Sequence, residues 1–69
     1  MTFAEFIEFA EITLGRSLSG VEANDYLDDL LNFDQTSELF EAIENLTGFV
    51  FTANLYEQID TFGELYEYV

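Results

Sequence analysis

The fold is decided by residues 34–48, which read DQTSELFEAIENLTG. Apolar side chains recur in this stretch at the spacing of one helix face, and carboxylates occupy the other sides. The positions on or beside this face are Leu39, Ile43 and Leu46, with Phe40 and Ala42 alongside. The pattern predicts a helix over residues 35–46. Asp34 is expected to cap its start and Gly48 to end it.

A second long helix is predicted over residues 3–14. Thr2 and Glu5 have the spacing of a capping box, in which each side chain accepts a hydrogen bond from the backbone N–H of the other residue. The apolar face of this helix consists of Phe3, Phe6, Ile7, Ala10 and Leu14. Gly15 is expected to end the helix, and Arg16 to interact with its negative end.

Shorter elements are expected in the rest of the chain. Residues 17–24 are polar and contain a glycine, which indicates a loop. A helical fragment over residues 25–31 is predicted next, with Asn24 or Asp25 as its cap. Residues 49–51, FVF, are interpreted as an extended connector, because a single strand would have no partner to pair with.

Two further helices are expected towards the end of the chain. Thr52 is expected to cap a short helix over residues 53–58. Thr61 and Glu64 form a second capping box, which predicts a last helix that runs to the end of the chain. Together these elements predict an all-α fold, a small irregular four-helix bundle, in one domain over residues 1–69.

The composition excludes several kinds of chemistry. The chain contains no Cys and no His, so it has no thiol nucleophile, no imidazole base and no disulfide. Carboxylate pairs one helical turn apart, such as Glu41 and Glu44, have no cleft beside them in a domain of this size, so no enzymatic activity is expected. An acidic cluster lacks the pattern of a calcium loop, so no metal site is expected there. Its members are Asn24, Asp25, Asp28 and Asp29.

Charge limits the partners of the chain. Fifteen acids against one base, Arg16, give a formal net charge of −14. This charge repels nucleic acid and anionic membranes and attracts basic protein surfaces, so the expected partner is a basic protein. Self-repulsion favours a monomer. Residues 1–14 contain three glutamates and no basic start, which is not typical of a signal peptide or a membrane span, and a cytoplasmic location is expected.

The order of these elements resembles that of the acyl and peptidyl carrier proteins, which are small acidic four-helix bundles. The similarity is most detailed over residues 59–69, IDTFGELYEYV, which look like the fourth helix of that family. Residues 47–51, TGFVF, look like the turn after its second helix, and residues 27–30, LDDL, fit the segment before that helix. The resemblance implies the same fold and a place in fatty acid, polyketide or nonribosomal peptide biosynthesis.

The chain departs from the family at the attachment site. Carrier proteins place an Asp-Ser-Leu motif at the start of the second helix, and its serine receives a phosphopantetheine arm. Residues 33–36 read FDQT here. One alignment puts Gln35 at the serine position and another puts Asp34 there, and neither side chain can form the phosphodiester. If phosphopantetheine is attached at all, Ser37 or Thr36 is the candidate; otherwise these hydroxyls bond the backbone of the first helical turn.

The resemblance also implies a surface for partner enzymes. The family uses its second helix to bind synthases, transferases and ligases, and the charge of the corresponding helix here fits a basic partner. The residues expected to form this surface are Asp34, Gln35, Glu38, Phe40, Glu41 and Glu44. Phe40 would be its apolar anchor, and Phe9 and Phe40 are both expected to be partly exposed, because each lies beside its helix's apolar face among acids.

A second function fits the same size and charge. An acidic protein can imitate the phosphates of nucleic acid and inhibit a DNA- or RNA-binding protein, as anti-defence proteins of phages do. Such a mimic needs acids spread in rows that match phosphate spacing, whereas a relative of carrier proteins concentrates its function at the second helix. The sequence leaves both interpretations open.

Overall fold

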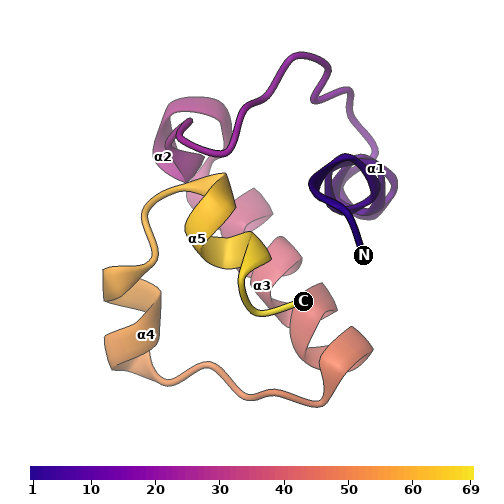
Figure 1. Cartoon of the computed structure of the whole chain (residues 1–69). Coiled ribbons are helices and arrows are strands. Elements are labelled where there is room, and N and C mark those ends of the chain that lie inside the picture. Colours follow the sequence, from indigo (N-terminus) through magenta and orange to yellow (C-terminus); the bar gives the residue numbers. More distant parts are fainter.

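The structure is a computed structural model that describes residues 1–69, and it contains helices but no strand (Figure 1). Along the chain, the helices are α1 (Phe3–Leu14), α2 (Leu27–Leu30), α3 (Phe33–Thr47), α4 (Ala53–Gln58) and α5 (Phe62–Tyr66). The all-α prediction is confirmed. The chain has five helices rather than the four of the predicted bundle. The fragment expected over residues 25–31 is the shorter helix α2, which starts after Tyr26 with no side-chain cap. None of them has the length and hydrophobicity needed to span a membrane.

Helix α1 has the predicted bounds, and its capping box is present. The Thr2 hydroxyl accepts a hydrogen bond from the Glu5 backbone N–H at 3.1 Å, and the Glu5 carboxylate accepts one from the Thr2 N–H at 2.7 Å. The bond from the Thr2 backbone holds the pKa of Glu5 below its usual range. Gly15 ends the helix in the left-handed conformation, with φ of 65°. The local sequence therefore specifies both ends of this helix.

Helix α5 also starts at its predicted capping box but is shorter than expected. It begins after Thr61 and ends at Tyr66 rather than at the end of the chain. Beyond it, the backbone N–H of Tyr68 bonds the carbonyl of Leu65, and that of Val69 bonds the carbonyl of Tyr66. These bonds span three residues instead of four, so the last residues form tight turns rather than α-helix.

The start of α3 differs from the sequence prediction. Its N-cap is Asn32, and the helix begins at Phe33, two residues earlier than expected. The Asn32 side chain accepts a hydrogen bond from the Gln35 N–H at 2.8 Å, and the Gln35 side chain accepts one from the Asn32 N–H at 3.1 Å. This reciprocal pair satisfies two backbone donors at the helix start, whereas a cap at Asp34 followed by Ser37 offers no such return bond. Asp34 lies instead in the first helical turn.

The position of this cap can be tested by two alanine substitutions. Asn32→Ala is expected to lower the free energy of unfolding by about 1 kcal/mol, because the N-cap acceptor is lost. Asp34→Ala is expected to change it by about 0.5 kcal/mol or less, because the Asp34 side chain is exposed and makes no capping bond. Urea denaturation followed by circular dichroism measures both values. A larger loss for Asp34→Ala would place the cap at Asp34.

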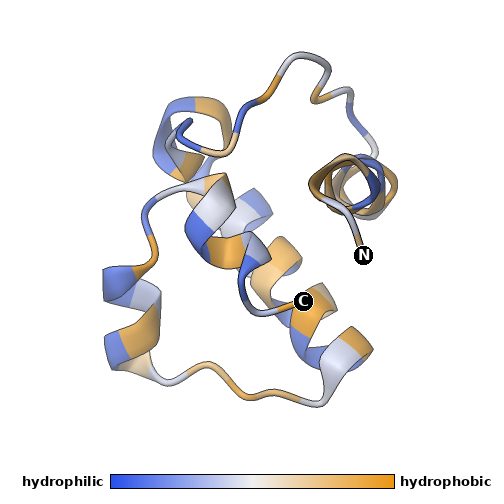
Figure 2. Ribbon diagram, viewed as in Figure 1, coloured by the Kyte–Doolittle hydropathy of each residue, from blue (hydrophilic) through white to orange (hydrophobic).

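The core forms where α1 packs against α3 and α5. Phe6 of α1, Phe40 of α3 and Phe62 of α5 are among its largest fully buried side chains. All twelve buried residues are hydrophobic: Phe6, Ala10, Leu18, Leu27, Leu31, Leu39, Phe40, Ile43, Phe51, Ile59, Phe62 and Leu65. Figure 2 shows that the connector between α3 and α4 is itself hydrophobic at its centre. Leu46, predicted on the apolar face of α3, is 51% exposed because it lies in the last turn, beyond the core.

The single base has a different contact from the one expected. The Arg16 guanidinium donates hydrogen bonds to the Leu30 carbonyl at 2.7 Å and to the Gln35 side chain at 3.3 Å. Gln35 is the residue that completes the α3 capping box. Arg16 therefore links the segment after α1 to the end of α2 and the start of α3, rather than interacting with the end of α1.

Candidate functional site

The exposed side of α3 carries a row of carboxylates. Asp34, Glu38 and Glu41 are all exposed, and their spacing of four and three residues places them on one helix face. The Asn32 cap makes Phe33 the first residue of α3, so the row of carboxylates begins in the first helical turn with Asp34. Three of the residues predicted to bind a partner are therefore exposed together on one side of α3.

The apolar anchor predicted for this surface is wrong. Phe40 is only 1% exposed, and its ring lies 4.9 Å from that of Phe51 and 4.4 Å from that of Tyr56, centroid to centroid. Residues that follow α3 in the chain pack over the Phe40 ring. The helical periodicity of α3 does not predict which residues pack there. The half-buried Phe9 packs against the core with part of its surface open, as predicted.

The exposed aromatic side chain of α3 is Phe33. It is the first residue of the helix and is 82% exposed. The predicted helix starts at residue 35, so the prediction leaves Phe33 outside it. The pattern Asn-x-x-Gln over residues 32–35 is a capping signature and would have revealed that Phe33 starts the helix beside the acidic face.

Two other predicted partner residues have structural contacts. The Glu44 carboxylate accepts a hydrogen bond at 2.8 Å from the backbone N–H of Phe51, so it holds the connector after α3. Gln35 caps α3 and accepts a hydrogen bond from Arg16. These two side chains stabilise the fold around the acidic face and are not free elements of it.

The two candidate hydroxyls lie within α3 rather than in its first turn. Thr36 and Ser37 are its fourth and fifth residues. The Thr36 hydroxyl oxygen is buried and has no hydrogen-bond partner, and the half-buried Ser37 makes no side-chain hydrogen bond. The expectation that they bond the backbone at the helix start is therefore wrong, because Asn32 already fills that role. The buried Thr36 oxygen is therefore not exposed to a transferase in this structure, although Thr36 lines the smaller cavity described below.

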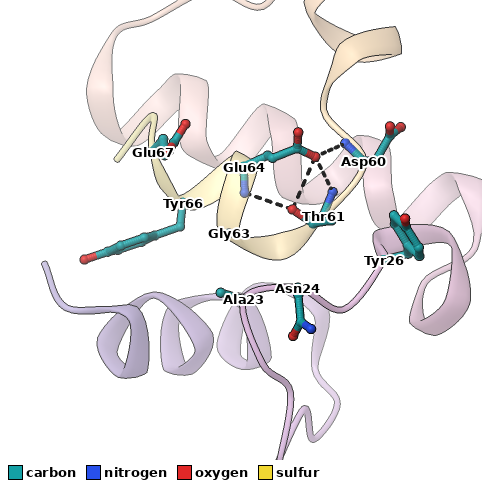
Figure 3. Close-up of a pocket in the computed structure, with 9 residues that line it drawn as sticks. All are labelled: Ala23, Asn24, Tyr26, Asp60, Thr61, Gly63, Glu64, Tyr66 and Glu67. Atoms are coloured by element: carbon teal, nitrogen blue, oxygen red, sulfur yellow. Dashed lines mark hydrogen bonds between the residues drawn. The ribbon is translucent and has the colours of Figure 1, made fainter.

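An open groove of about 690 Å³ lies between residues 23–26 and α5 (Figure 3). Its central carboxylate, Glu64, turns towards the helix start and accepts hydrogen bonds from the backbone N–H groups of Asp60 at 2.9 Å and Thr61 at 3.0 Å. These two bonds, that from Asp60 above all, hold the pKa of Glu64 below its usual range. Glu64 is thus an ionised capping group and is not available as a proton donor at neutral pH.

A smaller cavity of about 280 Å³ lies between α2, the first half of α3 and the end of α4. Phe33 and Tyr56 belong to its wall. Partial burial, followed by the charges of Glu44 and Glu41, raises the pKa of Tyr56, so its hydroxyl stays protonated at neutral pH.

The remaining acids form no metal-binding group. No three carboxylates lie close enough together to hold an ion. Within the acidic cluster of residues 24–29, the Asp25 carboxylate accepts a hydrogen bond from the Glu22 backbone N–H at 2.7 Å and so closes a turn.

The surface that combines charge with an exposed aromatic side chain is therefore the acidic face of α3, which we define as the row Asp34, Glu38 and Glu41 together with Phe33 at the start of the helix. Comparison with protein-family models, with curated proteins and with solved structures finds no match for this chain.

Proposed function

We propose that this chain is a non-enzymatic protein-binding module similar to carrier proteins. It binds a basic surface of a synthase, transferase or ligase in a system that resembles fatty acid, polyketide or nonribosomal peptide biosynthesis. The observation that carries the proposal is the acidic face of α3, a row of three exposed carboxylates on a helix that starts with a phenyl ring that is 82% exposed. An aromatic anchor beside complementary charge is a common arrangement at protein interfaces.

The order and length of the helices support the likeness to carrier proteins. A long α1 is followed by a long loop, a long α3, a short α4 and a closing α5. In that family the motif with the modified serine stands at the start of the second long helix. Aligned by its N-cap, Asn32, the start of α3 puts Phe33 at the serine position. This is a third alignment beside those that put Gln35 or Asp34 there. A phenyl ring cannot form a phosphodiester, and the module binds partners without carrying cargo there.

A competition experiment tests this function. The chain is added to a reaction in which a phosphopantetheinyl transferase modifies an authentic carrier protein with coenzyme A. We expect competitive inhibition of that reaction, and no mass increase on this chain itself. The double substitution Glu38→Lys and Glu41→Lys is expected to weaken inhibition by about tenfold or more, because it reverses charge where the partner is basic.

The control for that experiment has the same change in net charge at a different place. Glu8→Lys with Glu22→Lys alters two exposed acids outside α3 and is expected to weaken inhibition by about threefold at most, through the long-range field alone. A mass increase on Ser37 or Thr36 would make the chain a working carrier with a displaced attachment site. No inhibition, together with displacement of DNA from a DNA-binding enzyme, would favour the nucleic-acid mimic instead.

A further inference from the structure

The 280 Å³ cavity has an apolar wall that is already formed. Its hydrophobic lining residues are Leu27, Phe33, Phe40, Tyr56 and Ile59. Leu27, Phe40 and Ile59 are buried and belong to the core, so they fix the back of the cavity. Phe33 and Tyr56 are 82% and 38% exposed, so apolar surface continues from the cavity to the outside of the protein. An accessible apolar wall of this kind favours an apolar group from another molecule.

The outer edge of the cavity is anionic. Asp28, Glu57 and Asp60 also line it, and all three are exposed. No basic residue lines the cavity. The single base, Arg16, donates its hydrogen bonds to Leu30 and Gln35, which do not line the cavity. An occupant with negative charge is therefore repelled, and an occupant that places a cation next to its apolar part is attracted.

The volume of the cavity limits the size of the occupant. Pockets for cofactors and drug-sized molecules enclose about 300–1,000 Å³, and this cavity of about 280 Å³ lies below that range. It is large enough for one amino-acid side chain. A segment of a basic partner protein supplies such a side chain together with neighbouring cations.

We infer that this cavity receives a single apolar side chain from a partner segment in which lysine or arginine flanks that side chain. The inference rests on the proposed function and extends it, because it states what the partner presents beside the acidic face of α3. Phe33 belongs to both surfaces, so one partner segment can contact the carboxylates of α3 and enter the cavity.

Two short synthetic peptides of equal charge provide the test. One carries a leucine between two pairs of lysines, and the other has glycine in place of the leucine. Each is titrated into the 15N-labelled protein and followed by amide chemical shifts. The leucine peptide is expected to bind about tenfold tighter or more, because its side chain leaves water, and to shift the amides of Leu27, Tyr56 and Ile59. The glycine peptide keeps the lysines, so it is expected to shift the amides of the acidic residues on α3 and at the cavity edge, but to shift those of Leu27, Tyr56 and Ile59 much less.

Neutralised variants test the anionic edge without disturbing the core. The double variant Asp28→Asn with Glu57→Gln is expected to bind the leucine peptide about fivefold more weakly at low salt, because two exposed charge pairs with the lysines of the peptide are lost. The matched control, Glu8→Gln with Glu22→Gln, has the same net charge and is expected to bind the leucine peptide about twofold more weakly at most. Equal affinities of the two peptides, or equal effects of the two variants, would overturn the inference. The proposed function fails separately, if the chain does not compete with an authentic carrier protein.

Discussion

Phe40→Ala is expected to remove most of the stability of the protein, whereas Phe33→Ala is expected to leave it almost unchanged. Both substitutions delete the same atoms from the same helix, seven residues apart. Phe40 is 1% exposed and stacks on Tyr56, so its truncation leaves a hole in the core and costs about 3–5 kcal/mol. Phe33 is 82% exposed, and its truncation is expected to cost about 0.5 kcal/mol or less.

The size of the domain makes the first of these effects severe. A domain of 69 residues is stabilised by about 3–10 kcal/mol in total, so the loss expected for Phe40→Ala approaches the whole amount. Urea denaturation followed by circular dichroism measures both variants, and Phe40→Leu provides a folded intermediate if Phe40→Ala does not fold. Similar losses for the two alanine variants would contradict the burial of Phe40 and with it the stacking of Tyr56 on its ring.

The same pair of variants separates stability from binding. Phe33→Ala is expected to fold normally and to weaken competition with an authentic carrier protein, because Phe33 belongs to the acidic face of α3. Phe40 has no such exposed surface and meets a partner only at the back of the 280 Å³ cavity, so a folded Phe40→Leu variant is expected to weaken competition less than Phe33→Ala does. The sequence alone assigned the anchor role to Phe40, and the two variants decide between these positions.

Local signals in the sequence predicted most of the helices. The bounds of α1 and α4 agree with the prediction, because Thr2 and Thr52 mark their starts and each cap bonds a backbone N–H three residues later. The capping box at Thr61 and Glu64 likewise placed the start of α5. In these cases the hydrogen-bonding groups lie within four residues of one another, so the sequence contains the whole interaction.

Features that depend on distant residues were not predicted. The contact of Gln35 with Arg16, from the segment after α1, is one such feature. The Asn32 cap is by contrast local, because Gln35 lies three residues away, and the Asn-x-x-Gln pattern contains it. The burial of Phe40 depends on Phe51 and Tyr56, which follow α3 in the chain. Helical periodicity reports which residues share a face but not what covers that face.

Gly63→Ala is expected to destabilise the protein, although the same change inside a helix is usually favourable. Gly63 lies in α5 with ordinary helical backbone, where alanine is worth about 1 kcal/mol more than glycine. A Cβ at this position would stand 2.8 Å from the Ala23 carbonyl oxygen and 2.9 Å from the Ala23 Cβ. The obstacle is backbone, so the loop must move away from α5, and a loss of about 1–3 kcal/mol is expected.

At the same position, the long loop between α1 and α2 is hydrogen-bonded to the start of α5. The Gly63 backbone N–H donates to the Ala23 carbonyl at 2.8 Å, and the Phe62 N–H donates to the Asp25 carbonyl at 3.1 Å. Both amides are therefore expected to exchange with solvent faster in Gly63→Ala, as measured by hydrogen exchange. Adding Ala23→Gly removes one of the two clashes and is expected to restore part of the lost stability. If Gly63→Ala instead raises the free energy of unfolding, the loop does not lie against α5 at this distance.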